Sequence, residues 1–407
     1  DDNDDVYYSQ TSEETTTQPL RDFHNRYIKS KLISSVCNRD DTLIDYACGV
    51  GGDLAKWKYA KLKFVFGIDY AYDNIHNAKN GICARYIKEK KKNKQYPDAL
   101  FIKSDSGKNI RSHEDINTSQ KDKQIINAVF GTGPKDATIL GKGVYKNYGI
   151  ADSGFNVSSC QFAMHYFFED NKTVHSFLRN LSECTKVNGY YIGTCYDGET
   201  VFNLLRNKEK EESMTIFKGG EKMYEIIKQY DKTGFPDDEL SLGYGIDIYQ
   251  ESINKEKVFR EYLVNFTYLT RIMEDYGFVL ITQDEANHMN LPNSTGLFDE
   301  MFTQMEQEIV MRPNVKPNYR YAPNISVEEK QISFMNRYFV FKKVRSVDAK
   351  QIGEIIEKQI DIVNKEDTEN TQEKISVEEK TPVEVKPIAK KTKKKIVLKQ
   401  FSVEQDE

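Results

Sequence analysis

The stretch Leu43-Ile-Asp-Tyr-Ala-Cys-Gly-Val-Gly-Gly-Asp53 decides the fold. It begins as an apolar strand and runs into a glycine-rich turn, and residues 54–59 then have a helical pattern. Glycines in such a turn adopt positive φ and let the backbone approach a ligand closely. The pattern G-x-G-G-D differs from the G-x-G-x-x-G of dinucleotide loops, and Asp53 just inside the helix disfavours a pyrophosphate. The alternative is a tight strand-to-helix turn without a ligand.

Acidic residues also end the next two predicted strands. Residues 64–68 lead into Asp69, and residues 99–103 lead into Ser104 and Asp105. An acid at the end of the second strand can accept hydrogen bonds from the ribose hydroxyls of a nucleoside. The carboxylate or the adjacent backbone of Asp105 is placed to meet an adenine amino group. An adenosine without phosphates at this edge indicates S-adenosylmethionine rather than a dinucleotide.

Strand-like and helix-like segments alternate around this stretch. Residues 74–92 and 172–185 are helix-like, and the strand-like segments of the first half are 42–47, 64–69, 99–105, 154–164 and 189–196. This alternation predicts an α/β fold with a mostly parallel, doubly wound sheet covered by helices. The second half adds strand-like 247–252, 259–266, 278–284 and 337–344, and a helix near 267–276. We expect one α/β domain with insertions and no internal repeat.

Composition narrows the classes of protein further. The chain has 407 residues, 58 Lys and Arg, 63 Asp and Glu, and a net charge of -5, which excludes a uniformly basic nucleic-acid coat protein. No apolar run approaches the roughly 20 residues of a membrane-spanning helix. Because the start is acidic and polar, we expect no signal peptide. The chain begins at Asp1 rather than Met, as expected of a piece cut from a longer polypeptide.

The charge is unevenly distributed. Residues 1–17 contain six acids and no base and are predicted to be disordered. Residues 346–407 form a Lys/Glu-rich tail, also predicted to be disordered, whose basic run 390–395 is either a solvated tail or a contact for RNA or a localisation signal. The body, residues 18–345, has 46 bases against 43 acids, so the acidity belongs to the flanks. Its six scattered cysteines lack a C-x-x-C pair, which predicts reduced core residues and no metal site.

A second polar cluster follows the strand that starts at Val157. There Gln161 is followed by Phe-Ala-Met and then by His165, Tyr166 and two phenylalanines before Glu169. A buried strand that passes into such an aromatic loop places polar and stacking groups where a planar ligand binds. The alternative is a core strand whose His and Tyr satisfy backbone groups.

These stretches resemble the mRNA cap (guanine-N7) methyltransferases, especially the methyltransferase domain of large DNA-virus capping enzymes. The resemblance spans about 21–345 in family order, and its matching segments are RDFHNRYIKSKLI (21–33), LIDYACGVGGDLAKWK (43–58), FGIDYAYDNI (66–75), SSCQFAMHYFFE (158–169), NGYYIGTCYDG (188–198), FREYLVNF (259–266) and RYFVFKKV (337–344). It implies that 18–345 is an mRNA cap 0 methyltransferase domain with a class I, Rossmann-like fold and cap-binding insertions.

The resemblance also implies roles for individual residues. It assigns S-adenosylmethionine to Lys29, Ala47, Gly49, Gly51, Asp69, Asp105, Ser106, Gln161 and Tyr166. It assigns the cap to Asn25, Lys56, Arg85, His165, Glu261 and Tyr338, and the catalytic positions to Glu261, His165 and Tyr166. Asn336 is the other candidate for the C-terminal cap-facing position. Val50 stands where the family often has a lysine, so one phosphate contact is expected to be missing.

The implied reaction is an in-line transfer of methyl to guanine N7, which carries a free lone pair and needs no general base. The alternative is a catalytically silent RNA-binding subunit of a capping complex, and a third reading is another small-molecule or RNA methyltransferase. The implied partners are the capped RNA 5′ end and RNA triphosphatase and guanylyltransferase modules on the same or another chain, without a membrane. We expect an intracellular protein, in host cytoplasm or virion if viral and in the nucleus if cellular.

Overall fold

The computed structural model describes residues 17–251, 254–356 and 358, without the side chains of 254–257. The chain divides into two compact units, Asp1–Ile355 and Ile356–Glu407. The first unit therefore continues ten residues past the predicted end of the body, and Ala349 is buried in its core. Residues 1–16 and most of the predicted tail lie outside the described residues, so their predicted disorder stays a prediction.

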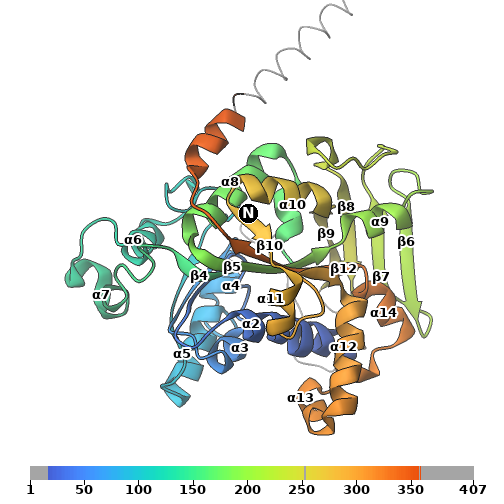
Figure 1. The fold of residues 1–407 in the computed structure, drawn as a ribbon, viewed down its shortest axis with the longest axis horizontal. Helices are drawn as coiled ribbons and strands as arrows, with labels where there is room; N and C mark the ends of the chain where they lie inside the picture. Colours follow the sequence, from blue (N-terminus) through green and yellow to red (C-terminus); the bar gives the residue numbers. More distant parts are fainter. Residues whose placement is uncertain (1–16, 252–253, 357, 359–407) are drawn as a thin grey trace, which may run out of the picture. The chain divides into compact units, whose positions relative to one another are not determined.

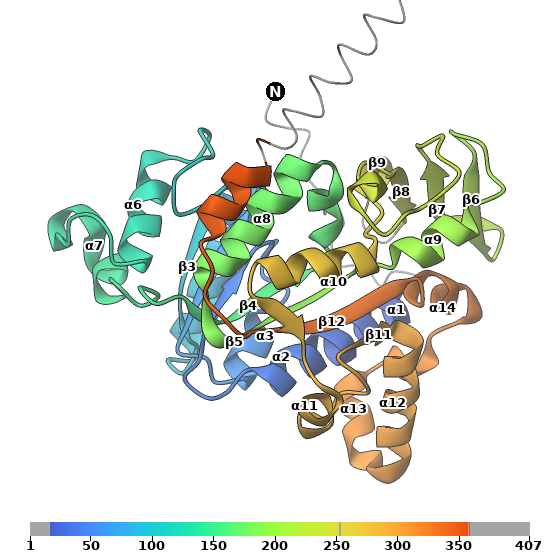
Figure 2. The same cartoon turned by 45° about the horizontal axis from the view of Figure 1, so that its top comes forward.

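The centre of the first unit is a large sheet (Figures 1 and 2). Its strands are β1 (Thr42–Asp45), β2 (Phe64–Asp69), β3 (Asp98–Lys103), β4 (Phe155–Gln161), β5 (Thr185–Tyr196), β10 (Phe278–Leu280), β11 (Thr295–Leu297) and β12 (Asn336–Lys343). Their order is β10-β12-β5-β4-β1-β2-β3, with β11 paired to β12. Strands β1 to β5 are parallel, and β12 runs antiparallel to β5. This confirms the predicted mostly parallel, doubly wound sheet.

Helices cover both faces of this sheet (Figure 2). One face carries α1 (Gln18–Asp22), the π-helical η1 (Phe23–Lys29), α2 (Ser30–Val36), α3 (Leu54–Tyr59), α4 (Tyr72–His76) and α5 (Ile82–Lys92). The other carries α6 (Gln120–Val129), η2 (Met164–Phe168), α8 (Asn171–Cys184) and α10 (Phe266–Asp275), and α7 (Ala137–Lys146) follows α6. Along β1, Leu43 packs into the first core and Ile44 into the second, as the two-residue period of a strand requires.

An antiparallel sheet is inserted after β5 and stands at the right of Figure 1. It follows α9 (Gly198–Leu204), is interrupted by η3 (Glu239–Ser241), and consists of β6 (Ser213–Lys218), β7 (Glu221–Lys228), β8 (Gly245–Gln250) and β9 (Asn254–Tyr262) in that order. The strand-like segments 247–252 and 259–266 overlap β8 and β9, whereas the β6–β7 hairpin was not predicted. This insertion brings Glu261, at the end of β9, into the first unit's interior.

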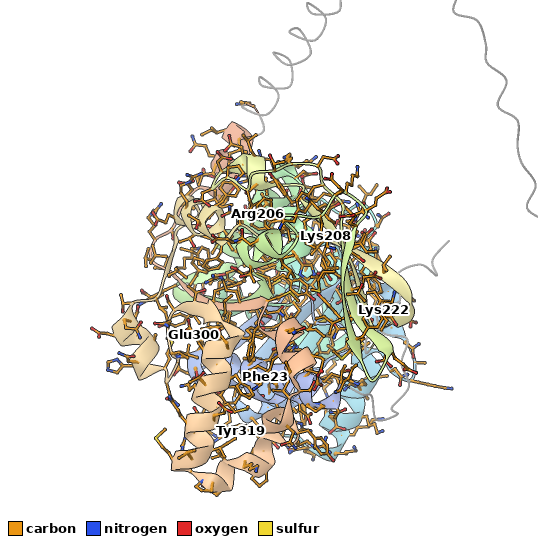
Figure 3. All side chains as sticks on the ribbon, turned by 90° about the vertical axis from the view of Figure 1, so that its right-hand side faces the viewer. Phe23, Arg206, Lys208, Lys222, Glu300 and Tyr319 are labelled. Carbon is orange, nitrogen blue, oxygen red and sulfur yellow. The ribbon has the colours of Figure 1, made fainter. Side chains whose placement is uncertain are left out.

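A second insertion lies between β10 and β12. It comprises α11 (Gln283–His288), α12 (Phe298–Met311), η4 (Pro313–Val315), α13 (Lys316–Tyr319), η5 (Ala322–Asn324) and α14 (Val327–Ser333). It packs on the N-terminal helices: Lys31 Nζ lies 2.5 Å from Glu308 Oε1, and the ring of Tyr319 lies 5.0 Å from that of Tyr27, between centroids. Within the insertion, the Tyr319 hydroxyl donates to the other Glu308 oxygen at 2.8 Å. Figure 3 shows Tyr319 and Phe23 on this side of the molecule.

The prediction of one helix over residues 74–92 is wrong, because the structure has two helices there, α4 and α5. The break falls at Gly81, where an added Cβ would lie 2.6 Å from the backbone nitrogen of Asn77. Only glycine fits this close return of the chain. Helix α5 is therefore a separate helix, and it starts beside the glycine-rich turn.

Candidate functional site

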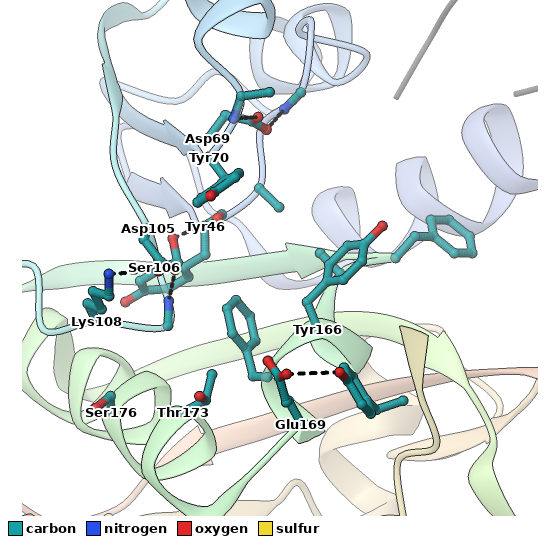
Figure 4. A pocket seen from close by; sticks show the side chains of 18 of the residues that line it. Tyr46, Asp69, Tyr70, Asp105, Ser106, Lys108, Tyr166, Glu169, Thr173 and Ser176 are labelled. Carbon is teal, nitrogen blue, oxygen red and sulfur yellow. Dashed lines mark hydrogen bonds and ion pairs between the residues drawn. The ribbon is translucent and has the colours of Figure 1, made fainter. Parts of the chain in front are cut away.

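A cavity of about 820 Å³, here called the sheet-edge cavity, opens at the carboxyl ends of the central strands (Figure 4). Ligands bind at this edge of doubly wound sheets, where the strand order reverses. Of the nine residues assigned to the cofactor, seven line it: Ala47, Gly49, Asp69, Asp105, Ser106, Gln161 and Tyr166. The two others, Lys29 and Gly51, lie outside its lining.

The two central glycines of the glycine-rich turn are required for different structural reasons. Gly49 has a φ of 52°, and its N–H donates to Asp69 Oδ2 at 2.7 Å. Gly51 has a φ of 81°, and an added Cβ would lie 2.8 Å from a side-chain carbon of Ile82. Gly49 thus joins the turn to the neighbouring strand, whereas Gly51 lets α5 pack closely against it.

Asp69 is held in place by the protein before any ligand arrives. Besides Gly49, the backbone N–H of Ala71 and the side-chain amide of Asn74 donate to Oδ1 at 3.0 and 2.9 Å. Burial raises the pKa of Asp69, and these hydrogen bonds oppose the shift. A carboxylate offers about four acceptor positions, so three bonds leave capacity for a ribose hydroxyl. The geometry fits a nucleoside.

The loop after β3 is anchored on both sides of its acid. The Asp105 carboxylate accepts from the Gly107 N–H at 2.8 Å, and the Asp105 N–H donates to Asp115 at 3.0 Å. The hydroxyl of Ser106 donates to the Tyr46 carbonyl at 2.8 Å. These bonds hold the loop while the Asp105 side chain keeps 29% exposure beside the cavity, as Figure 4 shows.

Two of the predicted lysines meet at one carboxylate. Lys29 Nζ and Lys56 Nζ each lie 2.8 Å from an oxygen of Asp53, next to the glycine turn. Burial would raise the pKa of Asp53, but the two lysines bring it down to about 2. At Asp45, burial and the nearby Asp53 raise the pKa to about 7, although Lys29 and the Ala47 N–H oppose the shift. The cluster joins η1 to the glycine turn.

His165 and Glu261 come together beside the cavity although 96 positions of sequence separate them. His165 Nε2 lies 3.5 Å from Glu261 Oε1, and each residue is only 2% exposed. Burial lowers the pKa of His165 to about 3 and raises that of Glu261 to about 8. Although the separation would suit an ion pair, both groups are therefore mostly uncharged near neutral pH.

The His165–Glu261 pair also has unused hydrogen-bonding capacity. Both ring nitrogens of His165 and the Oε2 atom of Glu261 have no hydrogen-bond partner among the described residues. Buried polar groups without partners are rare and costly, and they point to a ligand. The rings of Tyr166 and Tyr196 lie 4.3 and 6.2 Å from the His165 ring, between centroids. The arrangement can accept a planar molecule that donates hydrogen bonds.

The structure does not bring the remaining predicted cap residues into the sheet-edge cavity. The Asn25 amide donates to the Arg21 carbonyl at 3.1 Å, and Arg85 donates to the Val50 carbonyl in the glycine turn at 2.5 Å. Tyr338 is fully buried, and its hydroxyl accepts from the Asn293 N–H at 3.2 Å. The other candidate, Asn336, pairs in register with Tyr196.

Three residues at or near the site were not predicted: Asn74 and Tyr262, which line the cavity, and Tyr224, which does not. The hydroxyl of Tyr262 donates to Glu169 at 2.9 Å, and both residues line the cavity. The side-chain amide of Asn74 donates to the Asp69 carboxylate. Tyr224, from β7, donates to the Tyr196 hydroxyl at 2.7 Å. The only sequence signal for Tyr262 was its position next to Glu261, and Tyr224 had none because the β6–β7 hairpin was not recognised.

The strand order and the acids at the ends of β2 and β3 define a class I, Rossmann-like S-adenosylmethionine-dependent methyltransferase. The profile described as mRNA (guanine-N(7))-methyltransferase domain matches residues 6–344. The chain belongs to this family.

Curated relatives agree with this assignment. The chain is 26% identical over 366 residues to a probable mRNA-capping enzyme of Acanthamoeba polyphaga mimivirus, covering 86% of this chain and 29% of that protein. It is 25% identical to mRNA cap guanine-N(7) methyltransferase 1 of rice, covering 67% and 63% of the two chains. It is 23% identical to the mRNA cap guanine-N(7) methyltransferase of Saccharomyces cerevisiae, covering 80% and 64%. The chain thus spans less than two thirds of each of these relatives.

Proposed function

We propose that this chain transfers a methyl group from S-adenosylmethionine to N7 of the terminal guanosine of capped RNA. The observation that carries the proposal is the buried His165–Glu261 pair beside the sheet-edge cavity. Both ring nitrogens of His165 and Oε2 of Glu261 have no hydrogen-bond partner among the residues that the structure describes. Tyr166 follows His165 and Tyr262 follows Glu261, and both line that cavity. A guanine held by the pair therefore has its reacting edge close to the donor.

Donor binding is assigned to the residues at the strand ends. Asp69 holds the ribose, Asp105 and Ser106 meet the adenine, and Gln161 and Tyr166 close the cavity toward the cap. Ala47, Gly49, Gly51 and Lys29 complete this set. S-adenosylmethionine supplies an electrophilic methyl group on its sulfonium. The enzyme residues contribute by holding the reacting atoms in line, and such orientation is worth roughly 7–11 kcal/mol of barrier.

Glu261 recognises the guanine. The N1–H and N2–H groups of guanine are donors, and the Oε2 atom of Glu261 has no donor among the described residues. Hydrogen bonds from the guanine N1–H and N2–H groups, and the positive charge that develops on a guanine methylated at N7, favour the ionised form of Glu261 in the complex. The carboxylate ionised in this way stabilises the transition state more than the ground state. No residue needs to remove a proton from N7, and a His165 kept neutral by burial fits a positioning contact.

The cap phosphates are assigned to Lys56 and Arg85, with Asn25 on the guanosine side. Lys56 and Arg85 both contact the glycine turn through the carbonyls of Gly52 and Val50. Their charges are therefore fixed at the edge between the cavity and α5. Tyr338 has no role in this proposal, because its hydroxyl is held by Asn293.

The same proposal implies partner modules and a cellular location for the enzyme. A mimivirus relative is named an mRNA-capping enzyme and is much longer than this chain. We therefore include RNA triphosphatase and guanylyltransferase modules, on the same or another chain, among its partners. The reaction places the protein inside a cell, in host cytoplasm or virion if viral and in the nucleus if cellular. None of the described helices is both long and apolar enough to cross a membrane.

The test is methyl transfer from labelled S-adenosylmethionine to GpppRNA, with the product digested and analysed. We expect label in 7-methylguanosine and none with uncapped RNA. Label in an internal base would instead indicate another RNA methyltransferase. Calorimetry with S-adenosylmethionine alone covers the remaining case: an absence of binding heat would favour a silent RNA-binding subunit.

A further inference from the structure

Tyr196 is the last residue of β5 and reaches the edge of the sheet at which the cavity opens. Parallel pairing places Gln161, a lining residue of the cavity, beside Thr194, and the Thr194 hydroxyl donates to the Gln161 side chain at 3.2 Å. Side chains two residues apart on a strand share one face and lie about 7 Å apart. Tyr196 therefore follows Thr194 on the face that contacts the lining of the cavity.

The ring of Tyr196 also lies beside the His165–Glu261 pair. Its centroid is 6.2 Å from that of the His165 ring, at an interplanar angle of 33°. Burial, with Tyr224 and Glu261 close by, raises the pKa of Tyr196 well above its usual value. The Tyr196 hydroxyl therefore keeps its proton near neutral pH and can act as a hydrogen-bond donor.

The inserted antiparallel sheet brings Tyr224 and Glu261 to this place on one face. Residues in register across antiparallel strands point to the same face, and side chains alternate along each strand. Ile248 of β8 is in register with Ile226 of β7 and with Phe259 of β9. Tyr224 and Glu261 each lie two residues from one of these partners. They therefore share this face, and both are buried there.

The hydrogen-bonding capacity of the Tyr196 hydroxyl is only partly used. Its oxygen accepts from the Tyr224 hydroxyl at 2.7 Å. A tyrosine hydroxyl can donate its own proton as well as accept, and the part of the chain that the structure describes holds no acceptor for the proton of Tyr196. Because Tyr224 occupies one side of the oxygen, this proton points away from Tyr224. A buried donor without an acceptor indicates a ligand.

Guanine carries a matching acceptor next to the donors that face Glu261. Its N1–H and N2–H groups are donors, and O6 beside N1 is an acceptor. We propose that the Tyr196 hydroxyl donates to O6 of the cap guanine and that Tyr224 is the positioning residue that orients this hydroxyl. The proposal rests on the proposed function, because the guanine must lie at Glu261 for its O6 to meet Tyr196.

This contact gives the site a second means of selecting guanine. Adenine has an amino group, a donor, at the position of O6, so it would leave the Tyr196 proton facing another donor. Glu261 reads the two donors of guanine and Tyr196 reads its acceptor. The two residues come from different sheets, β9 of the inserted sheet and β5 of the central sheet.

The experiment replaces one atom of the ligand and one atom of the protein. The ligands are GpppA and its analogue with sulfur in place of guanine O6, at mildly acidic pH so that both bases keep N1–H. Sulfur is a much weaker acceptor than oxygen. Binding is measured by calorimetry with S-adenosylhomocysteine present, so that no turnover occurs. The test variant is Tyr196→Phe, and the matched control is Tyr191→Phe, another buried tyrosine of β5, whose hydroxyl contacts Met164 Sδ at 3.3 Å.

We expect the unmodified protein to bind GpppA about tenfold more tightly than the sulfur analogue, the scale of one buried hydrogen bond. Tyr196→Phe should weaken GpppA binding about tenfold and bind both ligands equally. Tyr224→Phe keeps the donor but not its orientation and should cost about threefold, with no further loss in the double variant Tyr196→Phe/Tyr224→Phe. Affinity for S-adenosylmethionine should stay unchanged in all variants, which shows that each is folded.

An undiminished preference for GpppA over the sulfur analogue in Tyr196→Phe overturns the proposal and moves the O6 contact to His165. Equal binding of the two ligands by the unmodified protein overturns it as well, and so does a loss of the preference in Tyr191→Phe. Failure of the proposed function looks different, since the unmodified protein would then neither bind nor methylate GpppA.

Discussion

The sheet-edge cavity and the His165–Glu261 pair lie next to each other but differ in how their polar groups are satisfied. At the cavity, Asp69 accepts three hydrogen bonds from the protein and Asp105 accepts one, so both acids are held ready. In the pair, three polar atoms have no partner among the described residues, and burial opposes charge on both groups. The donor side is preorganised, whereas the guanine side is incomplete until a substrate supplies its hydrogen bonds.

The difference indicates where specificity resides. A polar group that the protein already hydrogen-bonds costs little free energy when the wrong ligand binds, because its bonds stay in place. A buried carboxylate without a partner stays unpaired when the ligand has no donor, and this cost strongly disfavours such a ligand. Guanine selection should therefore depend on Glu261 far more than adenosine selection depends on any one residue of the cavity.

The largest expected effect follows from removing that carboxylate. Glu261→Ala should lower kcat/KM for GpppRNA by about a thousandfold, the scale seen when one transition-state contact is lost, while the dissociation constant for S-adenosylmethionine stays unchanged. Turnover is measured with labelled donor and donor binding by calorimetry. Glu199→Ala, at an exposed position of α9, is the matched control. Near-normal turnover in Glu261→Ala would remove Glu261 from the mechanism.

The second effect tests the preorganised side. Asp69→Asn replaces the acceptor of three hydrogen bonds with an amide that presents a donor toward Gly49 or Asn74. We expect donor affinity to fall about a hundredfold, which corresponds to about 2.7 kcal/mol, with little change in binding of the cap dinucleotide. Asp73→Asn, four residues further along on α4, is the control for charge. Equal losses of donor and cap binding would show that the two sides are not separable.

These two sides also differ in how far the sequence predicts them. Gly49, Asp69 and Asp105 follow recognisable strands, because the carboxyl ends of parallel strands converge at one edge. Glu261 was assigned only through family resemblance, since nothing in its own segment indicates that β9 folds back onto His165. Tyr224 was missed because its place depends on the β6–β7 hairpin. Local patterns thus predict the donor side, and long-range packing builds the guanine side.

The third prediction concerns how the protonation of buried Glu261 makes the stability of the fold depend on pH. Its pKa is raised from 4.5 to about 8 in the folded protein, so between these values the unfolded chain releases a proton that the folded chain keeps. Stability contributed by this group is therefore complete at low pH and is lost as pH rises toward about 8. Glu261→Gln does not titrate, and it should melt at a higher temperature than the unmodified protein.

The difference in Tm should be near zero at about pH 4.5 and grow up to about pH 8, because only the unmodified protein carries the titration. The expected change in Tm is about 1–2 °C for each kcal/mol, because the entropy of unfolding, about 2.1 cal/mol/K per residue, is large in a chain of 407 residues. His165, whose pKa is lowered to about 3 by burial, destabilises both proteins equally as pH falls below about 6.5, so it cancels in the comparison. A pH-independent difference would mean that Glu261 is ionised in the folded state.

The smallest expected effect concerns Asn74, which contacts Asp69 but was not assigned to the donor. Its amide supplies one of the three hydrogen bonds that hold the carboxylate, at 2.9 Å. Asn74→Ala removes this bond while the N–H groups of Gly49 and Ala71 still hold Asp69. The loss of one such bond is worth about 1 kcal/mol, so donor affinity should fall about fivefold.

Because Asn74 acts through Asp69, its effect should disappear when Asp69 is already changed: the double variant Asp69→Asn/Asn74→Ala should bind the donor no more weakly than Asp69→Asn alone. Asn80→Ala, at an exposed position of the following turn, should leave affinity unchanged. Calorimetry with S-adenosylmethionine measures the four variants and the unmodified protein. Additive losses would mean that Asn74 contacts the donor directly, and the cavity would then have an adenosine contact that does not pass through its acids.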